Sequence, residues 1–393
     1  MASLAITSGT MSAAEILANA VALAPAIAAR ADEIEALRRL PADLVAELRA
    51  AGLFRMGVSR AKGGPQMTLA EHLEVIEVLA RADPSTAWCV KIGTDSGLVA
   101  ELMPPSAAAR LLPDPDMATA GQFTTGHGTL ERVAGGYRLT GRFPFGSGIT
   151  HADVAMSGGM VVELGEPVVG PGGIPEGRLA FCRVDQLVIE NTWHTHGLRG
   201  SGSNHYRADS VFIPEDQALR IDEALFEGKE PLYSSGFNWV TTMAAVPLGC
   251  AAKALDATKA MIAGKRGGIP PQPMSQLPGV QDAIARAATR YGAARAFLYS
   301  AVNNFWRELE AGTPDLATKG RLALANVECF RMAADVTRML FDLVGANAVF
   351  EGQVLERCTR DALTLNQHMI VSDAARATYG AMMLGHEHPS PLY

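Results

Sequence analysis

A change of residue usage in the middle of the chain constrains its fold most. Residues 1–115 and 226–393 are rich in alanine, leucine, glutamate and arginine, whereas residues 116–225 hold many glycines and short runs of β-branched residues. The first set of residues favours helices, and short β-branched runs bounded by glycine or proline are typical of strands. The sequence therefore predicts an α+β chain, mainly α, with an N-terminal helical domain, a middle β domain and a C-terminal four-helix bundle.

Local signals place helices and strands within these three regions. Thr68 and Glu71 form the S/T-x-x-E pattern of a capping box, and a second candidate helix begins at Ser85 and runs through Leu98. Long alanine-rich segments joined by short loops indicate a bundle after residue 226. The helices expected there are residues 280–302, 318–344 and 354–384. The expected strands of the middle region are residues 137–140, 154–162, 179–184, 187–191 and 206–213.

Composition narrows the class of protein. The chain has 393 residues, of which 48% are hydrophobic and 19% charged, so it can bury a large core. Its net charge of −7 argues against nucleic acid as a partner. The five cysteines are scattered and form no CxxC pair, which fits a reducing cytoplasm. The uncharged run from Ile16 to Ala29 is too short to span a bilayer, which takes about 20 apolar residues, so we expect no membrane partner.

Two glycine-rich stretches of the middle region are candidate ligand contacts. The segment from Phe143 to Gly148 places two aromatic residues beside Ser147, between glycines that let a flat ligand approach the backbone. It also fits a strand that simply ends in a tight turn. The loop from Gly197 to Ser203 can cradle a phosphate with its amides, but it runs into a strand rather than a helix, so an ordinary loop fits equally well.

Histidines two residues apart raise the question of a metal site. On a strand, His194 and His196 would share one face and could ligate a metal together. No acidic or cysteine partner lies at a suitable spacing in the sequence, so we expect no metal site.

Six short segments, in chain order, carry motifs of a known family. They are Ala51–Phe54 with Gly63 and Gly64, Asp83–Trp88, Gly141–Ala152, Trp193–Ser203, Val280 with Gln281, and Leu355–His368. Together they resemble the acyl-CoA dehydrogenase superfamily, and within it the flavin-dependent monooxygenases that form the oxygenase component of two-component hydroxylases. The segment WHTHGLRGSGS is similar to the superfamily's most specific signature, and the final segment is similar to a pattern of the monooxygenase branch.

This resemblance implies a flavin site in which each residue has a role. Ser147 would hydrogen-bond the N5 edge of the flavin, with Phe145 near the ring and Gln122 on a strand beside it. Ser201 would lie in the loop that approaches the cofactor. Arg266 would reach the flavin phosphate from a neighbouring subunit, and Gly345 would lie where dehydrogenases enclose the other end of the flavin. The resemblance also implies a homotetramer.

The resemblance implies a reaction as well. Reduced FMN or FAD from a separate reductase would react with molecular oxygen to a C4a-hydroperoxyflavin, which hydroxylates a small aromatic substrate such as a phenol. His368 would face the substrate and remove its proton, so His368 and Ser147 are the expected catalytic residues. Two departures affect the substrate class. The stretch from Lys91 to Ser96 lacks a histidine that many phenol hydroxylases of the branch carry, and Phe143 stands where a tryptophan is frequent.

Two other functions remain open from the sequence. Phe350-Glu351-Gly352 resembles the triplet of acyl-CoA dehydrogenases in which the glutamate removes a proton next to a thioester, although Gln353 follows where those enzymes usually have threonine. The chain could also be a non-catalytic protein that retains the fold without its flavin. We expect the monooxygenase, since the segment ending at His368 matches that branch.

Overall fold

Helices form the N-terminal part of the protein, as the sequence predicts. The structure is a computed structural model and describes residues 10–170, 173–220 and 222–386. Thr68 accepts a hydrogen bond from the backbone N–H of Glu71, and the Glu71 side chain bonds back to Thr68, so the predicted capping box is confirmed. The helices before the sheet are α1 (Ala13–Ala29), α2 (Ala31–Leu37), α3 (Ala42–Ala50), α4 (Leu69–Ala82), α5 (Pro84–Gly93), α6 (Ser96–Leu102) and α7 (Pro105–Leu111).

The prediction of one helix from Ser85 through Leu98 was wrong. Helix α5 ends at Gly93, and α6 begins at Ser96 after a turn at Thr94 and Asp95. Glycine is a poor helix former, and Gly93 is the last residue of α5. The Lys91 ammonium then contacts the Asp95 carboxylate in the turn that follows.

A mixed sheet forms the middle of the protein, and within the described residues it has nine strands. The main strand order is β7-β8-β3-β2-β4-β6-β9, and β1 and β5 both pair with β4. Strand β4 lies parallel to β1 and β2, and the other pairs are antiparallel. The strands are β1 (Thr119–Gln122), β2 (Gly128–Val133), β3 (Gly136–Gly146), β4 (Val154–Glu163), β5 (Glu166–Pro167), β6 (Gly177–Arg183), β7 (Val188–Glu190), β8 (Asn204–Pro214) and β9 (Ala218–Arg220).

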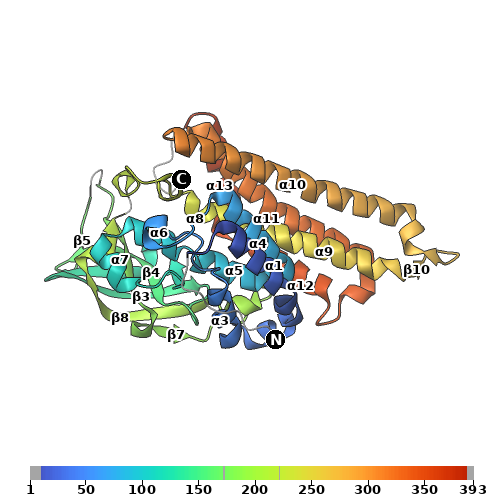
Figure 1. Ribbon diagram of the computed structural model, residues 1–393, viewed down its shortest axis with the longest axis horizontal. Coiled ribbons are helices and arrows are strands. Elements are labelled where there is room, and N and C mark those ends of the chain that lie inside the picture. Colours follow the sequence, from blue (N-terminus) through green and yellow to red (C-terminus); the bar gives the residue numbers. More distant parts are fainter. Residues whose placement is uncertain (1–9, 171–172, 221, 387–393) are drawn as a thin grey trace.

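A helical bundle follows the sheet. In Figure 1, α9, α10 and α11 run alongside one another away from the sheet, and a hairpin of β10 (Arg266–Gly267) and β11 (Gln272–Pro273) projects beyond their far end. The helices of this part are α8 (Asn238–Thr241), α9 (Ala245–Ala263), α10 (Pro278–Ala311), α11 (Leu316–Val344), α12 (Val354–Leu365) and α13 (Asp373–Met383).

The prediction of one continuous helix from 354 to 384 was wrong as well. Helix α12 ends at Leu365, a 3₁₀ turn spans Met369–Val371, and α13 begins at Asp373. The His368 side chain accepts from the N–H of Ile370, and the Ser372 side chain accepts from the N–H of Ala375. Side chains that cap backbone N–H groups in this way start new helical turns and interrupt the old helix.

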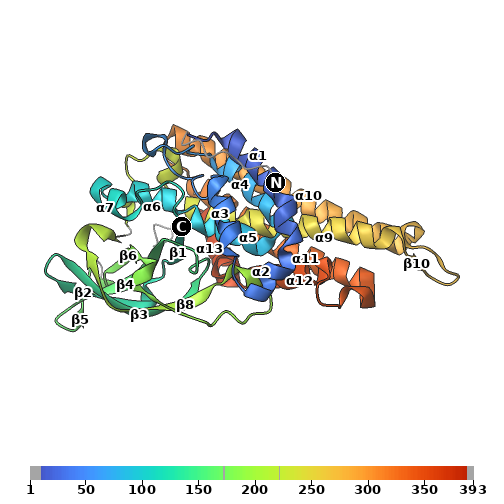
Figure 2. The same ribbon diagram turned by 60° about the horizontal axis from the view of Figure 1, so that its bottom comes forward.

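The fold class is confirmed: helices, a middle sheet and a helical bundle follow one another along the chain. One hydrophobic core lies among the helices and a second lies within the sheet, around Tyr137, Phe143 and Tyr206. Figure 2 shows the sheet below α6 and α7. The domain limits at residues 115 and 225 stay predictions.

In the part of the chain that the structure describes, no single helix is long and apolar enough to cross a membrane. The bent pair of α1 and α2 passes by length and composition together, but Ile16, Ala20 and Ile27 of α1 are buried in the protein core.

Candidate active site

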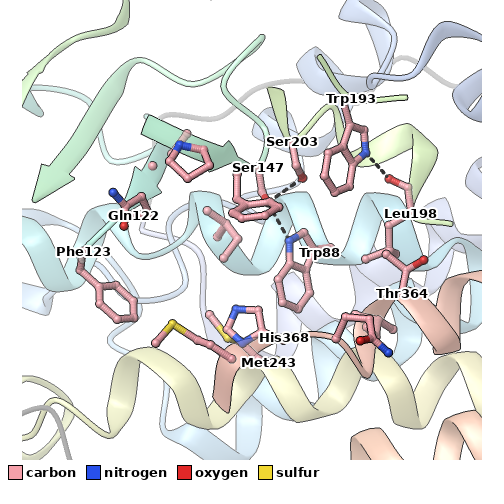
Figure 3. A pocket seen from close by; sticks show the side chains of 18 of the residues that line it. Trp88, Gln122, Phe123, Ser147, Trp193, Leu198, Ser203, Met243, Thr364 and His368 are labelled. Carbon is pink, nitrogen blue, oxygen red and sulfur yellow. Dashed lines mark hydrogen bonds between the residues drawn. The ribbon is translucent and has the colours of Figure 1, made fainter. Parts of the chain in front are cut away.

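A cavity of about 930 Å³ lies between the sheet and the helices (Figure 3). Its size is at the upper end of the range for small-molecule sites, and its walls are mainly apolar and aromatic. Segments far apart in the chain contribute to it: α5, β1, the end of β3, the glycine-rich loop and the end of α12. The residues used below that line it are Trp88, Ile92, Asp95, Gln122, Phe123, Phe145, Ser147, Trp193, His196, Leu198, Ser203, Trp239, Met243 and His368.

Three buried serines form a hydrogen-bonded chain at one wall of the cavity. Trp88 Nε1 donates to Ser147 Oγ at 2.9 Å, and Ser147 Oγ lies 2.7 Å from Ser203 Oγ (Figure 3). Ser203 Oγ in turn lies 2.7 Å from Ser201 Oγ. The turn after β3 and the glycine-rich loop, which the sequence analysis treated separately, therefore meet through these hydroxyls. Ser147 reaches the cavity and Ser201 lies behind Ser203.

Phe145 is held in an unusual backbone conformation beside this chain. Its φ of +61° is a left-handed value that non-glycine residues seldom adopt, and a break in the pairing of β3 with β8 occurs between Phe143 and Gly146. The ring is 60% exposed and meets the rings of Trp193 and His205 edge-on at 6.4 and 6.0 Å. Such strained residues persist where the surroundings fix them, often at ligand contacts.

The glycine-rich loop is fixed from both sides at Leu198, whose φ is +49°. Trp193 Nε1 donates to the Leu198 carbonyl at 2.8 Å, and the Leu198 N–H donates to Asp361 Oδ1 at 2.6 Å. Gly197 packs so closely on α12 that an added Cβ would lie 2.2 Å from the carbonyl oxygen of Arg360. Burial of the Asp361 carboxyl raises its pKa to about 7. Asp361 belongs to the segment Leu355–His368 that resembles the monooxygenase branch, but its role in anchoring this loop was not predicted from the sequence.

His368 lies on the other side of Trp88 from Ser147 (Figure 3). Its ring meets Trp88 edge-on at 5.6 Å, and Phe330 lies 6.5 Å away. Burial of the ring, together with the Lys91 charge, lowers the pKa of His368 to about 4. The neutral imidazole therefore predominates at pH 7. Nδ1 accepts a long contact of 3.4 Å from the Ile370 N–H, and such a weak hydrogen bond favours one ring tautomer only slightly.

A buried ion pair lies at the cavity where α5 ends. Lys91 is fully buried, and its Nζ contacts Asp95 Oδ1 at 2.9 Å, Asp95 Oδ2 at 2.7 Å and the Trp239 carbonyl at 2.7 Å. Asp95 lines the cavity with a side chain that is 15% exposed. Burial raises the pKa of Asp95 to about 6, while the Lys91 charge opposes that rise. Sequence reasoning noticed only that this stretch lacks a histidine, since an ion pair four residues apart looks like an ordinary solvated helix pair.

The structure brings together some of the expected site residues and leaves others apart. Gln122, Phe145, Ser147 and His368 line the cavity. The Gln122 amide is bound to Thr124, whose N–H donates to its oxygen and whose carbonyl accepts from its nitrogen.

Three other residues singled out in the sequence lie outside the cavity lining. Arg266 is exposed on the β10 hairpin and donates to the Pro271 carbonyl. Gly345 is exposed after α11 with open space around it, and Glu351 is exposed in the next loop.

The expectation that His194 and His196 share a strand was wrong. Thr192 and Trp193 both donate their N–H groups to the Asn204 side chain, and the chain from 191 to 198 has no regular strand. Within the described ranges, no group of three or more histidine, cysteine or acidic residues is arranged to hold a metal ion.

Comparisons with known proteins agree with this architecture. The family models "Acyl-CoA dehydrogenase, N-terminal domain" and "Acyl-CoA dehydrogenase, C-terminal domain" match residues 14–114 and 241–373. The indole-3-acetate monooxygenase of Pseudomonas putida is 29% identical over 372 residues, which are 93% of this chain and 92% of that protein.

Two solved structures are also similar. The 3-HSA hydroxylase from Rhodococcus sp. RHA1 has a TM-score of 0.87 and 26% identity, and the match covers 96% of this chain and 99% of that one. XiaF from Streptomyces sp., solved in complex with FADH2 and glycerol, has a TM-score of 0.87 and 26% identity, with 96% and 97% covered.

Proposed function

Because this chain belongs to the acyl-CoA dehydrogenase family and matches monooxygenases over nearly its whole length, we propose that it is the oxygenase component of a two-component flavin-dependent hydroxylase. Its substrate is a small aromatic molecule, and a separate reductase supplies the reduced flavin. One observation carries this proposal: a mainly apolar cavity presents the Ser147 hydroxyl and the neutral His368 ring on opposite sides of Trp88.

The residues present fit a flavin. The exposed face of Phe145 and the ring of Trp193 offer flat aromatic contact beside the Ser147 hydroxyl, and the Gln122 amide adds a polar group on the neighbouring strand. We assign Phe145, Ser147 and Gln122 to the cofactor, with Ser201 supporting Ser147 through Ser203. When bound, the reduced flavin supplies two electrons and activates molecular oxygen, so that one oxygen atom enters the aromatic ring of the substrate as a hydroxyl group and the other leaves as water.

The chain's own residues prepare the site for that reaction. Trp88, Phe123, Trp239 and Met243 form apolar walls that exclude water from the reacting groups. Trp88 also fixes Ser147 by donating to its oxygen, so the hydroxyl is oriented before a ligand arrives. His368 is the group of the cavity wall that we assign as acceptor of the substrate proton, because its neutral ring has a nitrogen that can take one; its lowered pKa makes it a weaker base than an unperturbed histidine.

The assembly is part of the proposal. Arg266 and Gly345 lie away from the cavity of their own chain, which fits contacts with the flavin of a neighbouring subunit in a homotetramer. All five cysteines are free and buried, which supports a cytoplasmic location.

The dehydrogenase alternative needs Glu351 at the reacting groups. Glu351 is exposed and is not part of the cavity wall, whereas His368 is. The geometry of the chain therefore favours the monooxygenase.

The experiment supplies FMN or FAD, a flavin reductase and NADH under ¹⁸O₂ with a panel of phenols and indoles. We expect a hydroxylated product that carries one ¹⁸O atom and forms only when protein and reductase are both present. A product without the label, or none with any member of the panel, contradicts the proposal. Anaerobic reduction of bound flavin by an acyl-CoA, lost in Glu351→Gln, would support the dehydrogenase instead.

A further inference from the structure

The carboxylate of Asp95, just beyond the end of α5, gives the cavity a polar group at a defined place on its wall. Trp88 and Ile92 lie four residues apart on α5, and Asp95 lies in the turn two residues beyond its last residue, Gly93; all three line the cavity. From Trp88 to Gly93 the helix rises about 7.5 Å at about 1.5 Å per residue, so Asp95 lies well beyond Trp88. The serine chain and the carboxylate therefore lie at two separated places on the cavity wall.

The lysine beside Asp95 has no hydrogen left for a ligand. An ammonium group has three N–H donors, and those of Lys91 are directed at the two Asp95 oxygens and the Trp239 carbonyl. Lys91 is also 0% exposed, so no ligand reaches it. A carboxylate accepts about four hydrogen bonds, so Asp95 keeps acceptor capacity on its cavity side.

The ionisable side chains that line the cavity also favour a hydrogen-bond donor over a carboxylate as its ligand. Among the described residues that line it, the ionisable side chains are Asp95, His127, His196 and His368, and no arginine or lysine is present. His127 and His196 are exposed. The cavity thus has an acceptor with negative character and no side chain that pairs with a carboxylate in the usual bidentate way.

The wall next to Asp95 is aromatic. Trp239, whose carbonyl binds Lys91, stacks on Phe123 at 6.3 Å and 18°. Trp239 Nε1 has less than 1 Å² of accessible surface, so it offers no donor to the cavity. A flat ring that lies against this wall would place a substituent at the Asp95 oxygens.

We propose that Asp95 determines the substrate class: the cavity selects a neutral aromatic molecule that donates a ring N–H or a hydroxyl to Asp95, and it discriminates against aromatic carboxylates. This inference rests on the proposed function and names the substrate of the same site. It distinguishes the chain from the Pseudomonas relative, whose name gives a carboxylate-bearing substrate, indole-3-acetate.

The test measures binding without turnover, by calorimetry in the presence of oxidised flavin. The probes are indole, benzofuran, which replaces the N–H by an oxygen, and indole-3-acetate. We expect indole to bind at least about tenfold more tightly than either of the others, which corresponds to about 1.4 kcal/mol. Binding of indole and benzofuran within about twofold of each other in the parent protein overturns the inference, and this comparison needs no variant.

Variants then assign the effect to Asp95. Asp95→Asn alone leaves Lys91 buried without its partner and risks misfolding, whereas Lys91→Met with Asp95→Leu replaces the whole pair by apolar groups. In the double variant we expect the indole preference over benzofuran to fall below about threefold, with tighter binding of indole-3-acetate. The control Asp216→Asn removes a carboxylate from an exposed pair with Arg110 and should change nothing. A preference that survives in the double variant overturns the role of Asp95.

The two proposals fail in different ways. An N–H preference without any ¹⁸O-labelled product refutes the hydroxylase and leaves the selectivity of the cavity in place. Labelled product without an N–H preference refutes the role of Asp95 and leaves the hydroxylase in place.

Discussion

Replacement of His368 by glutamine tests the proposed proton acceptor most directly. Glutamine keeps polar atoms near the position of the imidazole but cannot take a proton at neutral pH. General-base catalysis contributes about 10²–10⁴-fold, so we expect hydroxylation by His368→Gln to fall by at least about 10²-fold. Oxygen uptake should continue, because the residues assigned to the flavin are intact, and the missing product should appear as hydrogen peroxide.

The pKa of His368 sets the pH at which the parent enzyme loses activity. With a pKa of about 4, only about 1% of the rings are protonated at pH 6, whereas an unperturbed pKa of 6.5 gives about 75%. Protonation removes the base, so at saturating substrate, where titration of Asp95 near pH 6 does not limit binding, the yield of product per oxygen consumed should stay constant from pH 8 to pH 5 and fall near pH 4.

The assay is product and peroxide per oxygen consumed, measured from pH 4 to 8. His196→Gln is the matched control, because His196 lines the same cavity but is exposed, and it should keep the parent yield. A fall in yield near pH 6.5 in the parent, or a full yield in His368→Gln, would refute the assigned role.

Two further predictions concern the anchoring of the glycine-rich loop. The folded pKa of Asp361, about 7, is raised above the unfolded 3.8, so its contribution to stability is present below pH 3.8 and is lost as pH rises through 7. Asparagine does not ionise, so the free energy of unfolding of Asp361→Asn should rise relative to that of the parent by up to about 4 kcal/mol between pH 4 and pH 7. Denaturant titrations in which this difference stays constant over the same pH range contradict the prediction. Gly197→Ala should destabilise by about 1–3 kcal/mol, because its Cβ meets the α12 backbone at 2.2 Å, whereas Gly126→Ala has open space and should be nearly neutral in the same titrations.

The sequence was sufficient for the fold because its signals are long and repeated. Apolar residues at helical spacing continue for many turns in α10 and α11, and strands β3, β4 and β8 are 11, 10 and 11 residues long, which is enough to be recognised. Strands β1 and β9 carry only four and three residues, so no periodic pattern identifies them from the residues alone.

The site was only partly predictable, and the reason is specific to its residues. The segments around Ser147 and Ser203 were each recognised as glycine-rich, but the hydrogen bond that joins them links residues 56 apart in the chain. Asp361 is separated from its partner Leu198 by 163 residues. Contacts at such separations depend on the packing of sheet and bundle, which a local pattern does not encode.

The two helices that were wrongly predicted as continuous both break at the cavity. A regular helix would have continued past Asp95, and another past His368, with each side chain fixed by the helical period. In the structure Asp95 lies in the turn that follows Gly93, the last residue of α5, and the His368 side chain accepts from the Ile370 N–H after α12. Helix periodicity predicts neither turn, and each turn carries a polar group that lines the cavity. The errors of sequence reasoning therefore fall on the residues that we assign to substrate selection and proton transfer, as expected where function competes with local structural preference.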